Sequence, residues 1–201
     1  AEDTRSMRKL LNIHNIPLKD RPILSYNDFN GDRVRPTIMN WLNSNMAVAY
    51  ASDAGMPLIA DPGYQLSKQA AEAGFYVTAV PGASACITAL SLSGLPTDRF
   101  FFEGFLPVSK EKRRQKLKEL SSIPSTLIFY ESPKRLIKMF EDLIAIMGEN
   151  RRVVIARELT KKFEQIISGT LGELHALIQK KPLKGELVVL LDRPLTTGLE
   201  D

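Results

Sequence analysis

Apolar and polar positions along the chain follow two different periods. Short apolar runs are typical of buried strands, whereas apolar residues three or four positions apart predict helices. The predicted strands are residues 23–26, 46–51, 75–80, 99–105, 126–130, 153–156, 164–168 and 186–191. The predicted helices are residues 4–12, 33–43, 64–73, a small-residue helix ending at Ser93, and residues 110–120, 133–147 and 171–179. Strands and helices that alternate in this way indicate an α/β fold.

One turn-rich segment divides this pattern into two halves. Gly94-Leu95-Pro96-Thr97-Asp98 interrupts the alternation of elements and is the candidate interdomain link. We therefore expect an N-terminal α/β domain at residues 1–94, a C-terminal α/β domain at residues 95–194 and a tail at residues 195–201. No internal repeat or low-complexity tract disturbs this division.

Composition places the chain among ordinary globular proteins. It is 44% hydrophobic and 25% charged over 201 residues, and no apolar run is long enough to span a bilayer. The single cysteine, Cys86, cannot form an internal disulfide, which favours a reducing cytoplasm. With only two histidines, His14 and His175, we expect no metal site. A net charge of +4 suits a polyanionic partner without requiring one.

Two loops of small residues follow predicted strands in the first half. Ala-Ser-Asp-Ala-Gly-Met-Pro occupies residues 51–57, and Pro-Gly-Ala-Ser-Ala occupies residues 81–85. Ligands of open parallel sheets bind beyond the carboxyl ends of the strands, where small residues let backbone N–H groups approach them. The first loop lacks the spacing of a phosphate-binding P-loop. A tight turn explains the first loop and a helix N-cap at Ser84 explains the second equally well.

Polar residues also stand at the strand ends of the second half. Tyr130-Glu131-Ser132 and Glu158-Leu159-Thr160 each follow a strand, and Gly185-Glu186 precedes the last strand. Each group lies where a cleft could form, although Ser132 followed by Pro133 is also an ordinary start of a helix.

A basic segment precedes the middle of the second half. Residues 110–118 hold six basic residues and one acid, enough to neutralise several phosphates from a helix. The candidate RNA-binding residues are Lys110, Lys112, Arg113, Arg114 and Lys116. The alternative is a solvated helix face.

Taken together, these segments resemble the tetrapyrrole methylase superfamily and, within it, the ribosomal RNA small subunit methyltransferase I family. The resemblance is carried, in order, by residues 1–5, 52–64, 81–85, 93–100, 103–107, 129–132, 156–161 and 184–186. The chain departs from the family at Met56, where Thr is usual, and at Ala83, where Pro is usual. Members also begin with a strand and a Gly-Asn loop ahead of the segment that matches residues 1–5, and often carry histidines in the segment that matches residues 25–30.

The resemblance implies two α/β domains with a cofactor cleft between them, S-adenosylmethionine as the cofactor, and a homodimer. It implies methyl transfer to the ribose 2′-hydroxyl of a cytidine in the small-subunit (16S) ribosomal RNA, with the RNA or the ribosomal subunit as partner. The implied cofactor-binding residues are Asp53, Ala54, Gly55, Met56, Ser84, Ala85, Tyr130, Glu131, Leu159, Thr160 and Gly185.

Methyl transfer to a hydroxyl is an in-line displacement in which positioning supplies much of the acceleration. A ribose hydroxyl is a poor nucleophile, so a carboxylate within hydrogen-bond reach would help to take its proton. Glu2, Asp3 and Asp28 are the candidates, and Arg5 is the candidate for holding a neighbouring phosphate. The alternative for Glu2 and Asp3 is that they are ordinary partners of a helix dipole.

Two other functions remain open from the sequence. One keeps the cofactor and replaces the acceptor by a corrin or porphyrin precursor. The other is a non-catalytic RNA-binding or ribosome-assembly protein that retains the fold.

Overall fold

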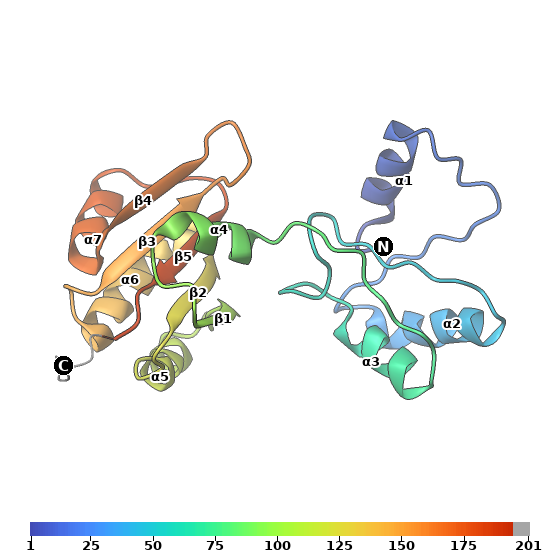
Figure 1. The fold of residues 1–201 in the computed structure, drawn as a ribbon, viewed down its shortest axis with the longest axis horizontal. Helices are drawn as coiled ribbons and strands as arrows, with labels where there is room; N and C mark the ends of the chain where they lie inside the picture. The colour runs from blue at the N-terminus through green and yellow to red at the C-terminus, as the bar shows by residue number, and fades with distance from the viewer. Residues whose placement is uncertain (195–201) are drawn as a thin grey trace. The chain divides into compact units, whose positions relative to one another are not determined.

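The computed structural model describes residues 1–194, so the expected tail at residues 195–201 lies outside the described part. The chain forms two compact units, one from Ala1 to Ser84 and one that begins at Ala85 (Figure 1). This division comes earlier than the expected link at residues 94–98. The reason is that α4 (Ala85–Ser93) packs against strands of the second unit, so that it belongs to that unit's core.

The first unit contains α1 (Thr4–Ile13), α2 (Gly31–Asn43) and α3 (Tyr64–Glu72). Its core is small and lies between α2 and α3. The buried members of this core are Tyr26, Ile38, Met39, Leu66 and Ala70. The three helices confirm those predicted for this half of the chain.

The strands predicted at residues 23–26, 46–51 and 75–80 are wrong for the first unit as the structure describes it. These segments have no strand assignment, and many of their side chains are exposed, including Met46 at 41% and Val80 at 85%. A strand requires a ladder of hydrogen bonds to a neighbour. Here only isolated bonds occur, such as Glu2 N–H to the Ala51 carbonyl and Tyr26 N–H to the Ala1 carbonyl.

The second unit holds every strand of the described chain. After α4 come β1 (Phe100–Phe105), α5 (Lys110–Leu120), β2 (Thr126–Glu131), α6 (Pro133–Met147), β3 (Arg152–Arg157), β4 (Gln165–Thr170), α7 (Leu171–Lys180) and β5 (Leu187–Leu191). Each matches a predicted element to within a few residues. Local signals set several boundaries: Pro133 opens α6, Gly148 at φ 82° ends it, and Thr170 and Glu173 form a capping box on α7.

The strands form one sheet in the order β1-β2-β5-β3-β4. β1 pairs with β2 in parallel, whereas β5 is antiparallel to both β2 and β3, and β4 is antiparallel to β3. β5 is therefore the central strand, and all five of its residues are buried. A strand buried on both faces reads as a continuous apolar run, which explains the sequence Leu-Val-Val-Leu-Leu.

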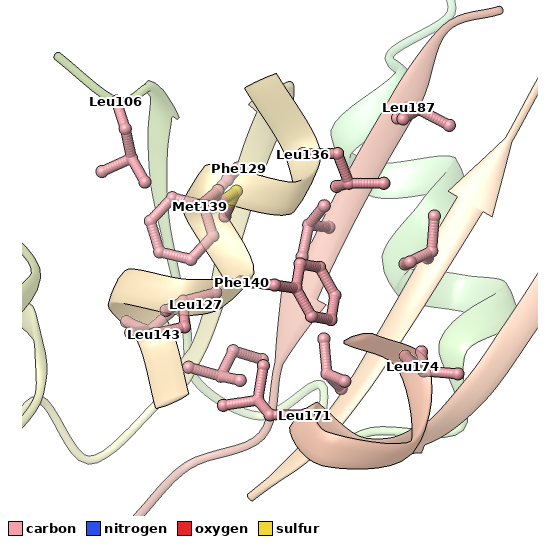
Figure 2. Packing of buried hydrophobic residues seen from close by; sticks show 14 of the residues in the cluster. Leu106, Leu127, Phe129, Leu136, Met139, Phe140, Leu143, Leu171, Leu174 and Leu187 are labelled. Atoms are coloured by element: carbon pink, nitrogen blue, oxygen red, sulfur yellow. The ribbon is translucent and has the colours of Figure 1, made fainter. Parts of the chain in front are cut away.

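Successive side chains of each strand point to opposite faces, so the sheet has two separate cores. On one face, α4 covers Ile128, Val154 and Leu190. On the other face, α5, α6 and α7 cover the larger core, in which Phe129 and Phe140 lie among leucines (Figure 2). Across the described residues, no helix combines the length and the apolar character that a membrane crossing requires.

Replacing Phe140 by Ala should remove a side chain that is fully buried in the larger core. We expect the free energy of unfolding to fall by about 3–5 kcal/mol, because the variant loses apolar burial and leaves a cavity. Urea denaturation followed by circular dichroism measures this change. Phe163→Ala is the matched control: Phe163 is 61% exposed, and its loss should change stability by less than about 0.5 kcal/mol.

Candidate active site

Several strand ends of the second unit meet at one edge of the sheet. Tyr130 pairs with Phe105 in β1 and with Val188 in β5, and Val188 pairs in turn with Ala156 in β3. The carboxyl ends of β1, β2 and β3 therefore lie beside the amino end of β5. This register brings the predicted residues Tyr130, Glu131, Leu159, Thr160 and Gly185 to the same edge of the second unit.

Tyr130 is held in place from two sides. Its hydroxyl oxygen accepts a hydrogen bond of 3.1 Å from the backbone N–H of Cys86, at the start of α4. Its ring meets Phe102 and Phe105 edge-on, with centroid distances of 4.9 and 5.7 Å. Leu159 packs against the same α4-side core as Tyr130. The predicted residues Ala85, Tyr130 and Leu159 thus belong to one neighbourhood.

The loop after β3 has an unusual backbone. Glu158 and Thr160 adopt positive φ values of 50° and 63°, and Gly185 adopts 93°. Non-glycine residues in this region carry strain that neighbouring contacts must compensate. One compensating contact is the Glu158 carboxylate, which accepts hydrogen bonds from the Glu186 N–H at 2.8 Å and from Lys161 Nζ at 3.2 Å.

These contacts fix Glu158, which the sequence placed in a candidate group at a strand end but not among the implied cofactor-binding residues. The Glu186 N–H bond, followed by Lys161, lowers the pKa of Glu158. A Cβ atom at Gly185 would collide with the Glu158 carboxylate, so the glycine leaves the room that this carboxylate occupies. The sequence shows a polar residue after a strand, but it carries no signal for the positive φ that defines the loop.

Glu131 lies inside the protein, with 3% of its surface exposed. Its Oε1 accepts a 2.8 Å hydrogen bond from the Ser132 N–H and lies 3.3 Å from Arg135 Nε. Burial raises the pKa of Glu131. Oε2 is buried and has no hydrogen-bond partner among the described residues. The carboxylate therefore orients Arg135, and its predicted contact with a cofactor is a further role that remains a prediction.

In the first unit, the two predicted loops contact each other. The Met56 N–H donates a 2.8 Å hydrogen bond to the Ala83 carbonyl. Gly55 has φ 72°, and a Cβ there would lie 2.7 Å from the Ala83 oxygen. Gly82 in turn faces the side chain of Met56. The structure thus brings residues 52–57 and 81–84 together, and a glycine is required at the closest approach.

The candidate catalytic residues lie close to the first of these loops. Glu2 Oε2 accepts a hydrogen bond of 3.1 Å from the Asp53 N–H. A hollow of about 200 Å³ within the first unit is lined by Asp3, Ala51, Ser52 and Asp53, among others. Glu2 and Asp3 are therefore positioned beside residues 51–53.

Asp3 and Arg5 form a closed pair. Asp3 caps α1 by accepting the Arg5 N–H at 2.7 Å, and its Oδ2 lies 2.6 Å from Arg5 Nη2. The hydrogen bond from the Arg5 side chain is the largest cause that lowers the pKa of Asp3 to about 2. A carboxylate with so low a pKa is a weak proton acceptor at neutral pH. Asp3 therefore has the structural role of a cap and holds Arg5.

In the first unit, nothing in the sequence indicated a further carboxylate near this site, Asp61. Burial raises the pKa of Asp61, and the nearby carboxylates Glu2, Asp53 and Asp28 raise it further. The same surroundings raise the pKa of Tyr50 to about 12, with burial as the largest cause. Asp28 and Glu2 thus belong to one acidic neighbourhood in the first unit. Within residues 1–194, no group of His, Cys, Asp and Glu is arranged to hold a metal ion.

The structure corrects one predicted RNA-binding residue. Arg113 is only 5% exposed, and its Nη2 lies 2.7 Å from Asp142 Oδ2. It therefore ties α5 to α6 and cannot neutralise an RNA phosphate. Helical spacing contained the signal, because Arg113 precedes Leu117 by one turn on the buried side of α5.

The remaining basic residues of α5 differ in how accessible their charges are to an RNA phosphate. Lys110 and Lys112 are exposed, and Arg114 is partly exposed. Lys116 Nζ lies 3.1 Å from Glu119 and 4.0 Å from Glu103, so part of its charge is already neutralised.

The fold and these motifs match known methylases. Residues 8–175 match the family model described as Tetrapyrrole (Corrin/Porphyrin) Methylases. The structure is similar to that of the methyltransferase CobJ, with a TM-score of 0.63 and 17% identity over 98% of this chain and 89% of that one. Cobalt precorrin-4 methyltransferase, CbiF, gives 0.57 and 15% over 89% and 78%. At these identities the likeness defines the fold class, and it confirms the predicted tetrapyrrole methylase fold.

Relatives with a higher sequence identity to this chain define its family within the tetrapyrrole methylases. The chain is 44% identical over 192 residues to "Ribosomal RNA small subunit methyltransferase I" of Halalkalibacterium halodurans, covering 96% of this chain and 65% of that protein. For the proteins of the same name from Xylella fastidiosa and Escherichia coli O157:H7, identity is 46% and 44%, over 95% and 96% of this chain and 70% and 67% of theirs. The chain belongs to the ribosomal RNA small subunit methyltransferase I family. It spans about two thirds of the length of these relatives.

Gly185→Ala should destabilise the second unit more than an ordinary glycine replacement. The added Cβ would push the Glu158 carboxylate from the Glu186 N–H, which adds to the backbone strain. Gly94→Ala is the matched control, since Gly94 has φ 66° and no neighbour within 4 Å of the added Cβ. We expect roughly 1–2 kcal/mol for the control and about 1 kcal/mol or more beyond that for Gly185→Ala, measured by urea denaturation. Equal losses would contradict the role given to Glu158.

The pair Arg113–Asp142 should respond as a buried ion pair. Arg113→Met leaves Asp142 buried without its main partner and should cost about 3–5 kcal/mol of unfolding free energy. Adding Asp142→Leu should recover most of this loss. Lys112→Ala, on the exposed side of the same helix, should change stability by less than about 0.5 kcal/mol. A small effect of Arg113→Met would show that the pair is not what joins α5 to α6.

Proposed function

We propose that the protein is an S-adenosylmethionine-dependent methyltransferase that acts on small-subunit ribosomal RNA. The proposal is carried by the edge of the second unit, where α4, β2, β3 and β5 bring Ala85, Tyr130, Leu159 and Gly185 together, in a chain whose relatives bear that name. We further propose the ribose 2′-hydroxyl of a cytidine as the acceptor, the cytoplasm as the location, and a homodimer as the assembly.

The residues at this edge fit a cofactor with both apolar and polar parts. Tyr130 and Leu159 offer partly buried apolar surface, and the left-handed turn at residues 158–160 redirects backbone groups that a regular strand would use in its ladder. We propose that the segments at this edge of the second unit hold S-adenosylmethionine, which supplies an activated methyl group when bound.

The chain's own groups then have separate tasks. Asp3 keeps Arg5 oriented, and Arg5 is 90% exposed in its side chain and so available to a phosphate. Because Asp3 is a weak base, we assign the removal of the hydroxyl proton to Glu2 or Asp28. General-base assistance of this kind is typically worth about 10²–10⁴ in rate, so Glu2→Gln or Asp28→Asn should slow single turnover by such a factor.

Transfer of a radioactive methyl group from S-adenosylmethionine tests the function directly. Small ribosomal subunits that lack this modification and uroporphyrinogen III are offered separately to the whole protein. Label in the RNA that resists alkaline cleavage at one cytidine supports the proposal. Label in the tetrapyrrole, or cofactor binding without any transfer, would replace it by one of the other functions.

RNA binding should depend steeply on salt. Each phosphate neutralised by a basic side chain lowers the slope of log K against log salt by about 0.7–0.9. Lys110→Ala and Lys112→Ala should each make this slope shallower by roughly that amount, as measured by fluorescence anisotropy. Lys180→Ala, on α7, is the charge-matched control and should leave the slope unchanged.

A further inference from the structure

A β-bulge in β1 turns one aromatic side chain to the opposite face of the sheet. Phe102 pairs with Ile128, whereas Gly104 pairs with Phe129 and Phe105 with Tyr130, so that Glu103 is an extra residue. In a regular strand, Phe102 and Phe105 would point to opposite faces. The bulge places both on the face that carries Tyr130 and α4, and Gly104 supplies the φ of 75° at the bulge.

The result is an aromatic side chain that is fixed and yet exposed. Phe105 contacts Tyr130 edge-on, but 55% of its surface remains accessible. The next residue, Leu106, returns to the opposite core and is only 2% exposed. Figure 2 shows Leu106 in that core beside Phe129. The backbone on both sides of Phe105 is therefore anchored, by the bulge before it and by Leu106 after it.

Two arginines hold the segment that follows. Arg135 donates hydrogen bonds to the carbonyls of Leu106 and Pro107, and Arg113 donates one of 3.1 Å to the carbonyl of Val108. Each guanidinium is oriented by a carboxylate, Glu131 for Arg135 and Asp142 for Arg113. Three consecutive carbonyls are thus fixed by two ion pairs. Buried ion pairs therefore hold the backbone of residues 106–108, while the exposed side chains of this stretch, Phe105 and Val108, are apolar.

The same segment leads directly into the positive charge of α5. Val108 is 78% exposed, and the exposed Lys110 and Lys112 follow it. Sites for single-stranded nucleic acid combine an aromatic surface, on which a base stacks, with cationic side chains that contact the backbone. Phe105 also lies at the sheet edge where Tyr130 is placed, and an acceptor for methyl transfer must approach that neighbourhood.

We infer that Phe105 stacks against an unpaired base of the substrate RNA, while Lys110 and Lys112 contact the adjoining phosphates. The inference rests on the proposed function. The bulge and the two arginine anchors fix the backbone on both sides of Phe105, and the edge-on contact with Tyr130 restrains the ring, so that little ordering is left to occur on binding.

Binding of two separate probes tests this inference. One probe is a fluorescein-labelled single-stranded RNA with a sequence taken from the small-subunit ribosomal RNA, followed by anisotropy. The other is S-adenosylhomocysteine, followed by calorimetry. Phe105→Leu keeps an apolar side chain but removes the flat face, and should weaken RNA binding by roughly tenfold to a hundredfold. Phe105→Tyr should stay within about threefold of the unchanged protein, since it retains the ring.

Phe101→Leu is the matched control on the same strand. Phe101 is 39% exposed and precedes the bulge, whereas Phe105 follows it. Its replacement should therefore leave RNA affinity unchanged. S-adenosylhomocysteine affinity and thermal melting should be the same in all three variants. Phe105→Trp gives an independent readout, because a stacked base quenches the added indole fluorescence, measured against the signal of Trp41 alone.

Three outcomes would overturn the inference. If Phe105→Leu binds RNA as well as the unchanged protein and no quenching occurs in Phe105→Trp, no base stacks there. If Phe105→Leu weakens S-adenosylhomocysteine binding instead, the ring belongs to the cofactor site. If the unchanged protein binds S-adenosylhomocysteine but no RNA, the RNA substrate itself is wrong, and the inference fails together with that part of the proposed function.

Discussion

The register of β5 between β2 and β3 is the constraint on which the second unit depends. β5 is antiparallel to both neighbours, and Val188 pairs with Tyr130 on one side and with Ala156 on the other. A slip of one residue would turn every β5 side chain to the wrong face of a sheet that is buried on both sides. The same register fixes the loop at residues 158–160 beside Gly185 and Glu186. Core packing therefore determines the geometry of the candidate site.

Charged groups act on this framework mainly by holding the backbone. Glu158 fixes the amino end of β5, and Glu131 and Asp142 orient the arginines that hold residues 106–108. Removing one partner of such a buried pair leaves an uncompensated charge, which costs more than the pair itself contributes. These contacts hold the strand ends at the place where a ligand would bind. Glu131, Asp142 and Glu158 can do this without touching the ligand themselves.

Sequence patterning predicted the second unit well because its elements are locally determined. The apolar run at residues 186–191, the start of α6 at Pro133 and the basic helix at residues 110–120 each follow from periodicity or from a boundary residue. In the first unit, patterning predicted the three helices correctly but failed at the strands. Residues 46–51 have the composition of a buried strand, but a strand forms only where a neighbour supplies the ladder, and the described first unit has none.

The candidate site was predicted in outline only. Glycines and polar residues at strand ends pointed to the loops at residues 52–57, 81–85 and 158–160, and the structure places the first two in contact and the third beside Gly185. The sequence alone could not predict the bulge at Glu103 or the positive φ of Glu158, because both depend on pairing across the sheet. Arg113 was assigned to RNA from charge alone, although its helical position matched the buried side.

Hydrogen–deuterium exchange with and without S-adenosylhomocysteine tests the central claim most directly, namely that the strand ends of the second unit form a cofactor site. The account predicts slower exchange on ligand binding at residues 85–86, 158–160 and 184–186. Amides in α7 should exchange at the same rate in both states. Binding that leaves residues 158–160 and 184–186 unprotected would contradict the account.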